Sequence, residues 1–293
     1  MSLPVRRRMP ARRTRRRVRR RRVVNWWRLL GGALMVVTGG GMAWLLAAAD
    51  FEVDPAGVEL SGLHYTDARL VHSTMRPWLN DGVNLFRLPA ADIELALTRL
   101  PAVASADVQV LLPNRLKVAV LERVPVFVWR TGQNDYLVDS AGVLLRTVLP
   151  TEALSADLPL VDDGRQAQAQ PQPGDVLEAV DLQAILKLGA VDPALLGSRA
   201  EWLSLSVEEH DGYVLSAEPG AWRAVFGHYT PTLRPPDIID RQVQCLRALL
   251  DTDEGEIETI YLSVSDERCG TYIARARPAP SDEPEPGEEP DDG

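Results

Sequence analysis

An uncharged segment near the amino terminus constrains the fold of this chain more than any other feature. Residues 29–49 run for 21 positions without an ionisable side chain, between Arg28 and Asp50. A helix of that length spans roughly 30 Å, which matches the hydrocarbon core of a bilayer. Only a helix satisfies its own backbone groups in a single crossing of lipid. The sequence therefore predicts one transmembrane helix over residues 29–49.

The flanking charges predict how this helix is oriented. Residues 1–28 contain 13 arginines and no acidic residue, whereas the chain after the span carries 19 basic and 41 acidic residues, a formal charge of −22. Positively charged flanks are retained in the cytoplasm, so we expect the Arg-rich tail inside the cytoplasmic (inner) membrane and the rest of the chain outside it. The acidic exterior argues against nucleic acid as a partner. A cleaved signal peptide is the alternative, because Ala47-Ala48-Ala49 resembles a cleavage site.

The next segment, residues 51–124, shows a short α+β pattern. Apolar and turn residues predict an irregular strand over 51–60, a helix capped by Thr66, a second helix that begins near Pro89, and two alternating strands over 106–112 and 116–120. Pro113-Asn114 separates the last two strands as a turn. The expected order is β-α-α-β-β.

An ordered set of short motifs runs through this segment. The motifs are Val58-x-Leu60-x-Gly62, Gly82-x-Asn84-Leu85-Phe86, Leu100-Pro101-x-Val103, Ala106-x-Val108 and Leu112-Pro113-x-x-Leu116-x-Val118-x-Val120-x-Glu122-Arg123-x-Pro125. The set resembles the POTRA domain of the FtsQ/DivIB family of bacterial cell division proteins. POTRA domains also precede outer-membrane barrels, but we expect the remaining chain to be too short for a many-stranded barrel.

The segment from 125 to 277 predicts a mostly antiparallel β domain with flanking helices. Short apolar runs and Gly-containing turns predict strands near 126–129, 136–139, 143–145, 202–207, 213–215, 222–226, 257–264 and 271–275, and helices over 176–191 and 236–250. The start of this segment again resembles the FtsQ family, in Pro125-x-x-x-Trp129 and Tyr136-Leu137-Val138-Asp139-x-x-Gly142. Residues 278–293, with five prolines and seven acidic residues, predict a disordered tail.

The sequence contains no recognisable catalytic or metal-binding motif. The four histidines are scattered, no CxxC or HxxxH pair occurs, and neither a phosphate-binding loop nor a Gly-x-Ser-x-Gly turn is present. We therefore expect no enzyme, no cofactor and no metal.

The resemblance implies a non-enzymatic divisome scaffold, concentrated at the septum, that links early and late division proteins. Its implied partners are small bitopic coiled-coil proteins of the FtsB/FtsL or DivIC type and the septal peptidoglycan synthase complex. Two other functions remain open: a membrane-anchored cell-wall hydrolase, whose paired carboxylates need not be close in sequence, and a POTRA-type envelope assembly chaperone.

Two features near the carboxyl terminus are candidates for function. The last predicted strand, Thr271-Tyr272-Ile273-Ala274-Arg275, is expected to lie at a sheet edge, where a partner strand can pair with its free backbone groups. The resemblance implies the same location for the partner. The alternative is a solubilised edge with no partner.

Cys245 and Cys269 form either a disulfide, favoured by an oxidising compartment, or a pair of free thiols with Cys245 buried on its helix.

Overall fold

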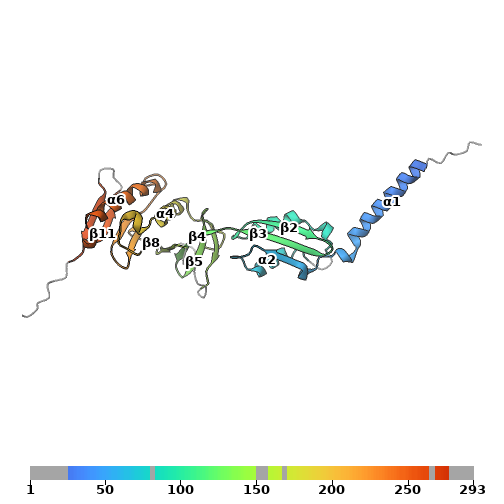
Figure 1. The fold of residues 1–293 in the computed structure, drawn as a ribbon, viewed down its shortest axis with the longest axis horizontal. Coiled ribbons are helices and arrows are strands. Elements are labelled where there is room, and N and C mark those ends of the chain that lie inside the picture. The colour runs from blue at the N-terminus through green and yellow to red at the C-terminus, as the bar shows by residue number, and fades with distance from the viewer. Residues whose placement is uncertain (1–25, 80–82, 150–157, 167–169, 264–267, 277–293) are drawn as a thin grey trace, which may run out of the picture.

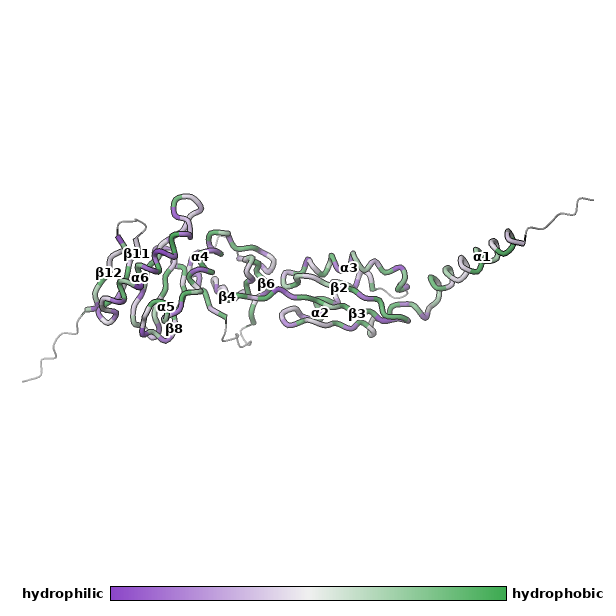
Figure 2. Tube along the Cα trace, turned by 45° about the horizontal axis from the view of Figure 1, so that its top comes forward, coloured by the Kyte–Doolittle hydropathy of each residue, from purple (hydrophilic) through white to green (hydrophobic). Residues whose placement is uncertain are grey.

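The structure is a computed structural model that describes residues 26–79, 83–149, 158–166, 170–263 and 268–276. A long helix, a small α+β domain and a larger sheet-rich domain follow one another along the longest axis of the molecule (Figure 1). The same order is visible in the second view, where β11 and β12 lie at the end remote from α1 (Figure 2). Most of the Arg-rich tail, residues 1–25, and the predicted acidic tail, 278–293, lie outside the described residues.

The first helix, α1, spans Trp26–Ala47. Within it, Leu29–Leu46 is, among the described residues, the one stretch of helix long and apolar enough to cross a membrane. Its side chains contact little else in the chain, so its apolar surface is available to lipid. This helix agrees with the predicted single-pass membrane anchor.

The small domain has the predicted β-α-α-β-β order. Its strands pair in the order β1-β3-β2, with β1 parallel to β3 and β2 antiparallel to β3. Its elements are η1 (Ala49–Phe51), η2 (Pro55–Gly57), β1 (Val58–Ser61), α2 (Ala68–Met75), η3 (Leu85–Arg87), α3 (Ala90–Leu97), β2 (Val103–Leu111) and β3 (Arg115–Glu122).

Two local predictions for this domain are wrong. The expected strand over 51–60 is extended only from Val58, because the Asp54 carboxylate accepts the Ala56 N–H and caps a 3-10 turn that begins at Pro55. The cap of α2 is Asp67 rather than Thr66, since the Asp67 carboxylate accepts the Arg69 N–H at 2.8 Å.

The core of the small domain lies between its helices and one face of its sheet. Apolar residues one helical turn apart on α2 and α3 face alternate residues of the strands. The buried members are Val53, Val71, Met75, Leu85, Ile93, Leu97, Val103, Val108, Leu116, Val118 and Val120.

The larger domain is built on a mixed sheet of nine described strands in the order β12-β11-β10-β9-β8-β7-β4-β5-β6. Five neighbouring pairs are antiparallel, and the pairs β4–β7, β7–β8 and β10–β11 are parallel. The strands are β4 (Pro125–Thr131), β5 (Asn134–Asp139), β6 (Leu144–Thr147), β7 (Leu160–Asp163), β8 (Trp202–Glu208), β9 (Gly212–Glu218), β10 (Arg223–Gly227), β11 (Ile257–Leu262) and β12 (Gly270–Ala274). The α+β class is therefore confirmed, with parallel pairs that the sequence pattern did not predict.

Helices α4 (Ala179–Gly189), α5 (Pro193–Leu196) and α6 (Ile239–Asp253) pack against this sheet through one large apolar cluster. Ile185 and Leu188 of α4 and Leu246 of α6 are buried in it together with strand residues such as Phe226 and Ile260. The short helix α5 is not predicted by the sequence pattern, because one turn is too short to show a period.

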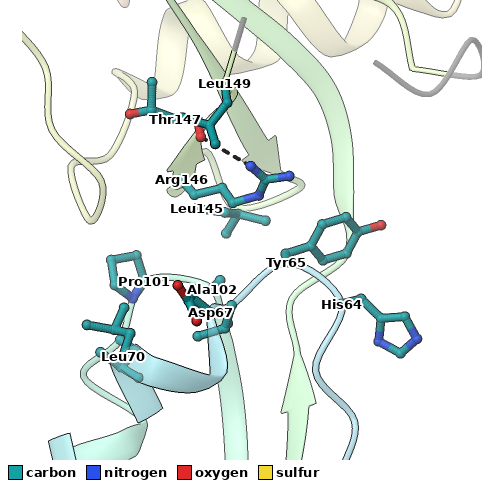
Figure 3. A pocket seen from close by; sticks show the side chains of 12 residues that line it. His64, Tyr65, Asp67, Leu70, Pro101, Ala102, Leu145, Arg146, Thr147 and Leu149 are labelled. Atoms are coloured by element: carbon teal, nitrogen blue, oxygen red, sulfur yellow. Dashed lines mark hydrogen bonds between the residues drawn. The ribbon is translucent and has the colours of Figure 1, made fainter. Parts of the chain in front are cut away.

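The two domains share apolar contacts at their junction. Only two residues separate β3 from β4. Ala102 of the first domain is buried with Leu137 and Leu145 of the second, and Tyr65 packs against them. In Figure 3, Tyr65 and Ala102 face Leu145 across a groove of about 450 Å³. The domains therefore join through a packed contact rather than through a linker.

The carboxylate of Glu122 organises the first domain's side of this junction. It accepts the backbone N–H groups of His64 at 2.6 Å, Tyr65 at 2.8 Å and Thr66 at 2.7 Å. Burial raises the pKa of Glu122, but the Thr66 hydroxyl and the three N–H groups lower it more, so the net pKa lies below the ordinary value. This carboxylate therefore stabilises the fold at neutral pH, and its contribution is lost as the pH falls through the lowered pKa.

Replacing Glu122 with Gln is expected to loosen residues 64–66. Hydrogen bonds to a charged group contribute about 1.5 to 3 kcal/mol each, so these amides should exchange with deuterium on the order of tenfold faster or more. Exchange measured by mass spectrometry on full-length protein tests this. Glu59→Gln is the matched control, because Glu59 is half exposed and its carboxylate pairs with Arg115 at 3.4 Å. Equal exchange in the two variants would contradict the assignment.

Candidate protein-binding edge

The strand β12 ends the nine-strand order and, among the described residues, pairs only with β11. The pairing is antiparallel and sets Tyr272 opposite Ile260 and Ile273 opposite Thr259. In such a pair, alternate residues of the edge strand direct their N–H and C=O groups away from the sheet. The outer side of β12 therefore offers main-chain donors and acceptors to an incoming strand.

The side chains of β12 divide between the two faces of the sheet. Directly paired residues lie on the same face, so Tyr272 shares the face of buried Ile260, against which the helices pack, and Ile273 shares the opposite face with Thr259. Tyr272 is 53% exposed and Ile273 is 52% exposed. A strand added to this edge gains an aromatic contact on one face and an aliphatic contact on the other.

Contacts at both ends of β12 fix its position. Before the strand, Cys269 is joined by a disulfide to Cys245 of α6, with the two Cα atoms 5.0 Å apart. Gly270 follows, and a Cβ there would lie 2.3 Å from the Tyr261 carbonyl oxygen, so this close approach requires glycine. After the strand, the Arg275 N–H donates to the Glu256 carbonyl at 2.7 Å, and the Arg275 guanidinium donates to the Ala221 carbonyl.

Two other sheet edges in the described residues are less open. The first domain's edge strand β2 has a bulge between Val103 and Ser105 and carries the charged Asp107, both of which discourage strand addition. At the far end of the large sheet, Leu144 of β6 exchanges backbone hydrogen bonds with Gly174 and Asp175. The edge β12 combines free backbone groups with exposed apolar side chains, which favours it as the protein-binding edge.

A cavity of about 650 Å³ in the larger domain is the strongest alternative site. Arg165 donates to the Asp163 carboxylate at 2.7 and 2.9 Å and to the Asp181 carboxylate at 2.9 and 3.3 Å. Asp163 also accepts the Trp129 indole N–H at 3.2 Å, and Asp181 accepts the Tyr213 hydroxyl at 2.5 Å. One guanidinium therefore donates hydrogen bonds to both carboxylates.

This network fits a structural role better than acid–base chemistry. Hydrogen bonding to Asp163 is the largest of the influences that raise the pKa of Arg165, so the guanidinium stays charged. Burial, followed by the Asp181 charge, raises the pKa of Tyr213, so its hydroxyl stays protonated. A general acid must carry a proton that it can release, whereas these carboxylates face permanent donors. In the described residues, no group of three His, Cys, Asp or Glu side chains is placed to hold a metal ion.

The structure places the predicted site residues as follows. Thr271 to Ala274 lie in β12, which begins one residue before the predicted strand, and Arg275 lies just beyond it with its main chain and side chain already hydrogen-bonded. Sequence reasoning did not find the network of Asp163, Arg165, Asp181 and Tyr213, because its members come from three separate elements and form no motif. Tyr261, 40% exposed and paired with Thr271, was also missed as a neighbour of the edge.

Comparisons with known proteins cover parts of the chain. Residues 56–123 match the family described as "POTRA domain, FtsQ-type". The "Cell division protein FtsQ" of Chloroflexus aggregans is 29% identical over 131 residues, 44% of this chain and 45% of the relative. The protein of that name from Myxococcus fulvus is 33% identical over 118 residues, 40% of this chain and 39% of the relative. The one from Chloroflexus aurantiacus is 32% identical over 97 residues, 33% and 34% of the two chains. The chain thus spans less than half the length of the curated relatives that it matches.

Proposed function

We propose that this chain, which belongs to the FtsQ/DivIB family, is a non-enzymatic scaffold that brings division proteins together at the bacterial septum. The family match covers the first domain, and the cell division names of the relatives support the process. The observation that carries the binding role is the strand β12, an open edge with exposed Tyr272 and Ile273.

The proposed mode of binding is the addition of a strand to β12. An extended segment of the partner pairs with the free N–H and C=O groups, and its alternate side chains contact Tyr272 on one face and Ile273 on the other. By family resemblance the partner is a small single-pass coiled-coil protein of the FtsB/FtsL or DivIC type, and the septal peptidoglycan synthase is recruited through that complex.

The proposed arrangement in the cell follows from the anchor. The Arg-rich flank of α1 lies in the cytoplasm, and both folded domains lie outside the membrane. The edge β12 lies at the end of the molecule remote from α1 (Figures 1 and 2). In this arrangement the partner binds away from the bilayer, so a single-pass partner needs an extramembrane segment long enough to reach β12.

Depletion combined with microscopy tests this function. Cells that lose the protein are expected to stop dividing and to lengthen, and a fluorescent fusion to the full chain is expected to concentrate in a band at the division site. A membrane-anchored hydrolase without the scaffold role predicts altered wall composition and no loss of the partner from the septum. Normal division after complete depletion would overturn the proposal.

A further inference from the structure

The first domain is held directly against the carboxyl end of the membrane helix. The Asn84 side-chain amide donates to the Leu45 carbonyl of α1 at 3.0 Å, and the same side chain accepts the Phe86 N–H at 3.0 Å. Val53 and Asp54 lie in the segment that connects α1 to β1. Their N–H groups also donate to backbone carbonyls of the domain. A helix leaves its last carbonyls without intrahelical partners, so Asn84 satisfies one of them at the membrane boundary.

An aromatic chain continues this contact from the helix to the domain. Trp44 of α1 and Phe51 meet edge-on with ring centroids 6.4 Å apart, and Phe51 meets Phe86 of η3 at 5.3 Å. Trp44 lies within the stretch Leu29–Leu46 that is able to span a membrane, and Phe86 is 46% exposed. Aromatic rings favour the zone between lipid headgroups and acyl chains. The contacts of Phe51 with both Trp44 and Phe86 therefore place Phe86 near that depth.

The turn between β2 and β3 lies at the same end of the domain. The Asp54 N–H, in the connection from α1, donates to the Asn114 carbonyl of this turn at 3.1 Å. Leu111 and Leu112, which precede Asn114, are 38% and 59% exposed. Leu112 therefore presents an apolar side chain beside the connection to the membrane helix.

The charges around these residues are mixed. Arg87 and Arg115 lie at this end of the domain, and Arg115 pairs with Glu59 at 3.4 Å. Asp50 and Glu52 lie in the connection. A contact that depended on anionic lipid would need a clear excess of basic residues, which the described residues at this end do not provide. The apolar and aromatic side chains, rather than charge, are what fit a lipid surface.

We propose that Phe86 and Leu112 insert into the headgroup layer of the bilayer that α1 crosses, so that the first domain lies against lipid. The surface is continuous with the membrane helix through Trp44 and Phe51. Together with the Asn84 hydrogen bond, this contact holds the domain in one orientation relative to the membrane and thereby fixes the direction in which β12 points. The proposal depends on α1 crossing the bilayer and is independent of the proposed septal function.

Spin labels on the full chain test the insertion. Single cysteines replace Phe86, Leu112 or Leu121, with Cys245 and Cys269 left in their disulfide, and the protein is placed at one copy per nanodisc in phosphatidylcholine. Leu121 is the matched control, because it is 65% exposed on the same hairpin but lies about 20 Å further along β3 at roughly 3.3 Å per residue. Collisions with oxygen, which concentrates in lipid, are compared with collisions with a water-soluble nickel chelate.

The labels at 86 and 112 are expected to show an oxygen-to-nickel ratio several-fold above that at 121. Adding Phe86→Asp to the protein labelled at 112 should lower the ratio towards the control, because a charge resists insertion. The same ratios are expected when anionic lipid is added. Equal ratios at 112 and 121 would overturn the proposal. A raised ratio that appears only in vesicles crowded with the protein would also overturn it, because a second copy of the chain would then cover these residues.

Discussion

Replacing Ile273 with proline is expected to weaken binding of the proposed FtsB-type partner about tenfold or more while the protein remains folded. Proline has no backbone N–H and fixes φ, and the register with β11 turns the N–H of residue 273 toward Thr259. The substitution therefore breaks a bond to β11 and bends the strand, which displaces the outward-facing groups of Tyr272 and Ala274. Each partner hydrogen bond that this displacement breaks costs about 0.5 to 1.5 kcal/mol, and about 1.4 kcal/mol is a tenfold change in dissociation constant. Distortion of the neighbouring pairs adds to this loss.

We expect the substitution to lower the stability of the fold less than it lowers the affinity for the partner. Ile273 is half exposed and lies in the last strand of the sheet, so the substitution leaves the buried residues around Ile260 and Leu246 in place. Pull-down of the partner by detergent-solubilised full-length protein and the melting temperature of the same sample are measured together. We expect a large fall in recovered partner with a shift of only a few degrees in melting temperature.

Two variants separate the backbone effect from other causes. Ile273→Val keeps the N–H and a β-branched side chain, so it should retain most of the binding. Ser105→Pro places the same constraint on β2, the edge strand of the first domain, next to its bulge, and should leave partner recovery unchanged. If Ser105→Pro abolishes recovery and Ile273→Pro does not, the binding edge is in the first domain.

The local pattern of the sequence was sufficient to predict the first domain. Period-2 alternation along β2 and β3 and helical spacing on α2 and α3 each report which face of an element is buried, and the elements follow one another closely in the chain. The two errors arise at local caps, Asp54 and Asp67, which the apolar periodicity does not report. Thr66 lies one residue before the cap, where Glu122, 56 residues away, accepts its N–H, and Asp67 caps α2 instead.

The order of strands in the larger sheet could not be predicted in this way. β4 and β7 are parallel neighbours, yet 28 residues separate the end of one from the start of the other, and no local period encodes such a crossover. Apolar runs predicted β8 to β12 but not their neighbours, and β7 was not predicted at all. The edge position of β12 was predicted because it is the last strand along the chain, and its faces became assignable only from the register with β11.

Removing the bond between Cys245 and Cys269 is expected to release β12 from α6. The bond closes a loop with a sequence separation of 24 residues, for which the chain-entropy model gives about 3 kcal/mol of stabilisation. In natively exported protein, non-reducing mass spectrometry should find the two cysteine peptides joined. Two free thiols would show that the bond does not form in the cell.

Deuterium exchange in the double variant Cys245→Ala, Cys269→Ser shows which segment the bond stabilises. Cys269 directly precedes Gly270, whereas Cys245 lies on a helix that is also held by buried Leu246 and Leu250. Amides of 270–274 should therefore exchange with deuterium up to about a hundredfold faster, since 1.4 kcal/mol corresponds to a factor of ten, while α6 changes little. Because strand addition needs β12 in register, partner affinity should fall in the same variant. If 270–274 exchange faster but partner affinity does not change, the partner orders β12 itself. If exchange is equal in the two proteins, β11 and Arg275 hold the strand without the bond.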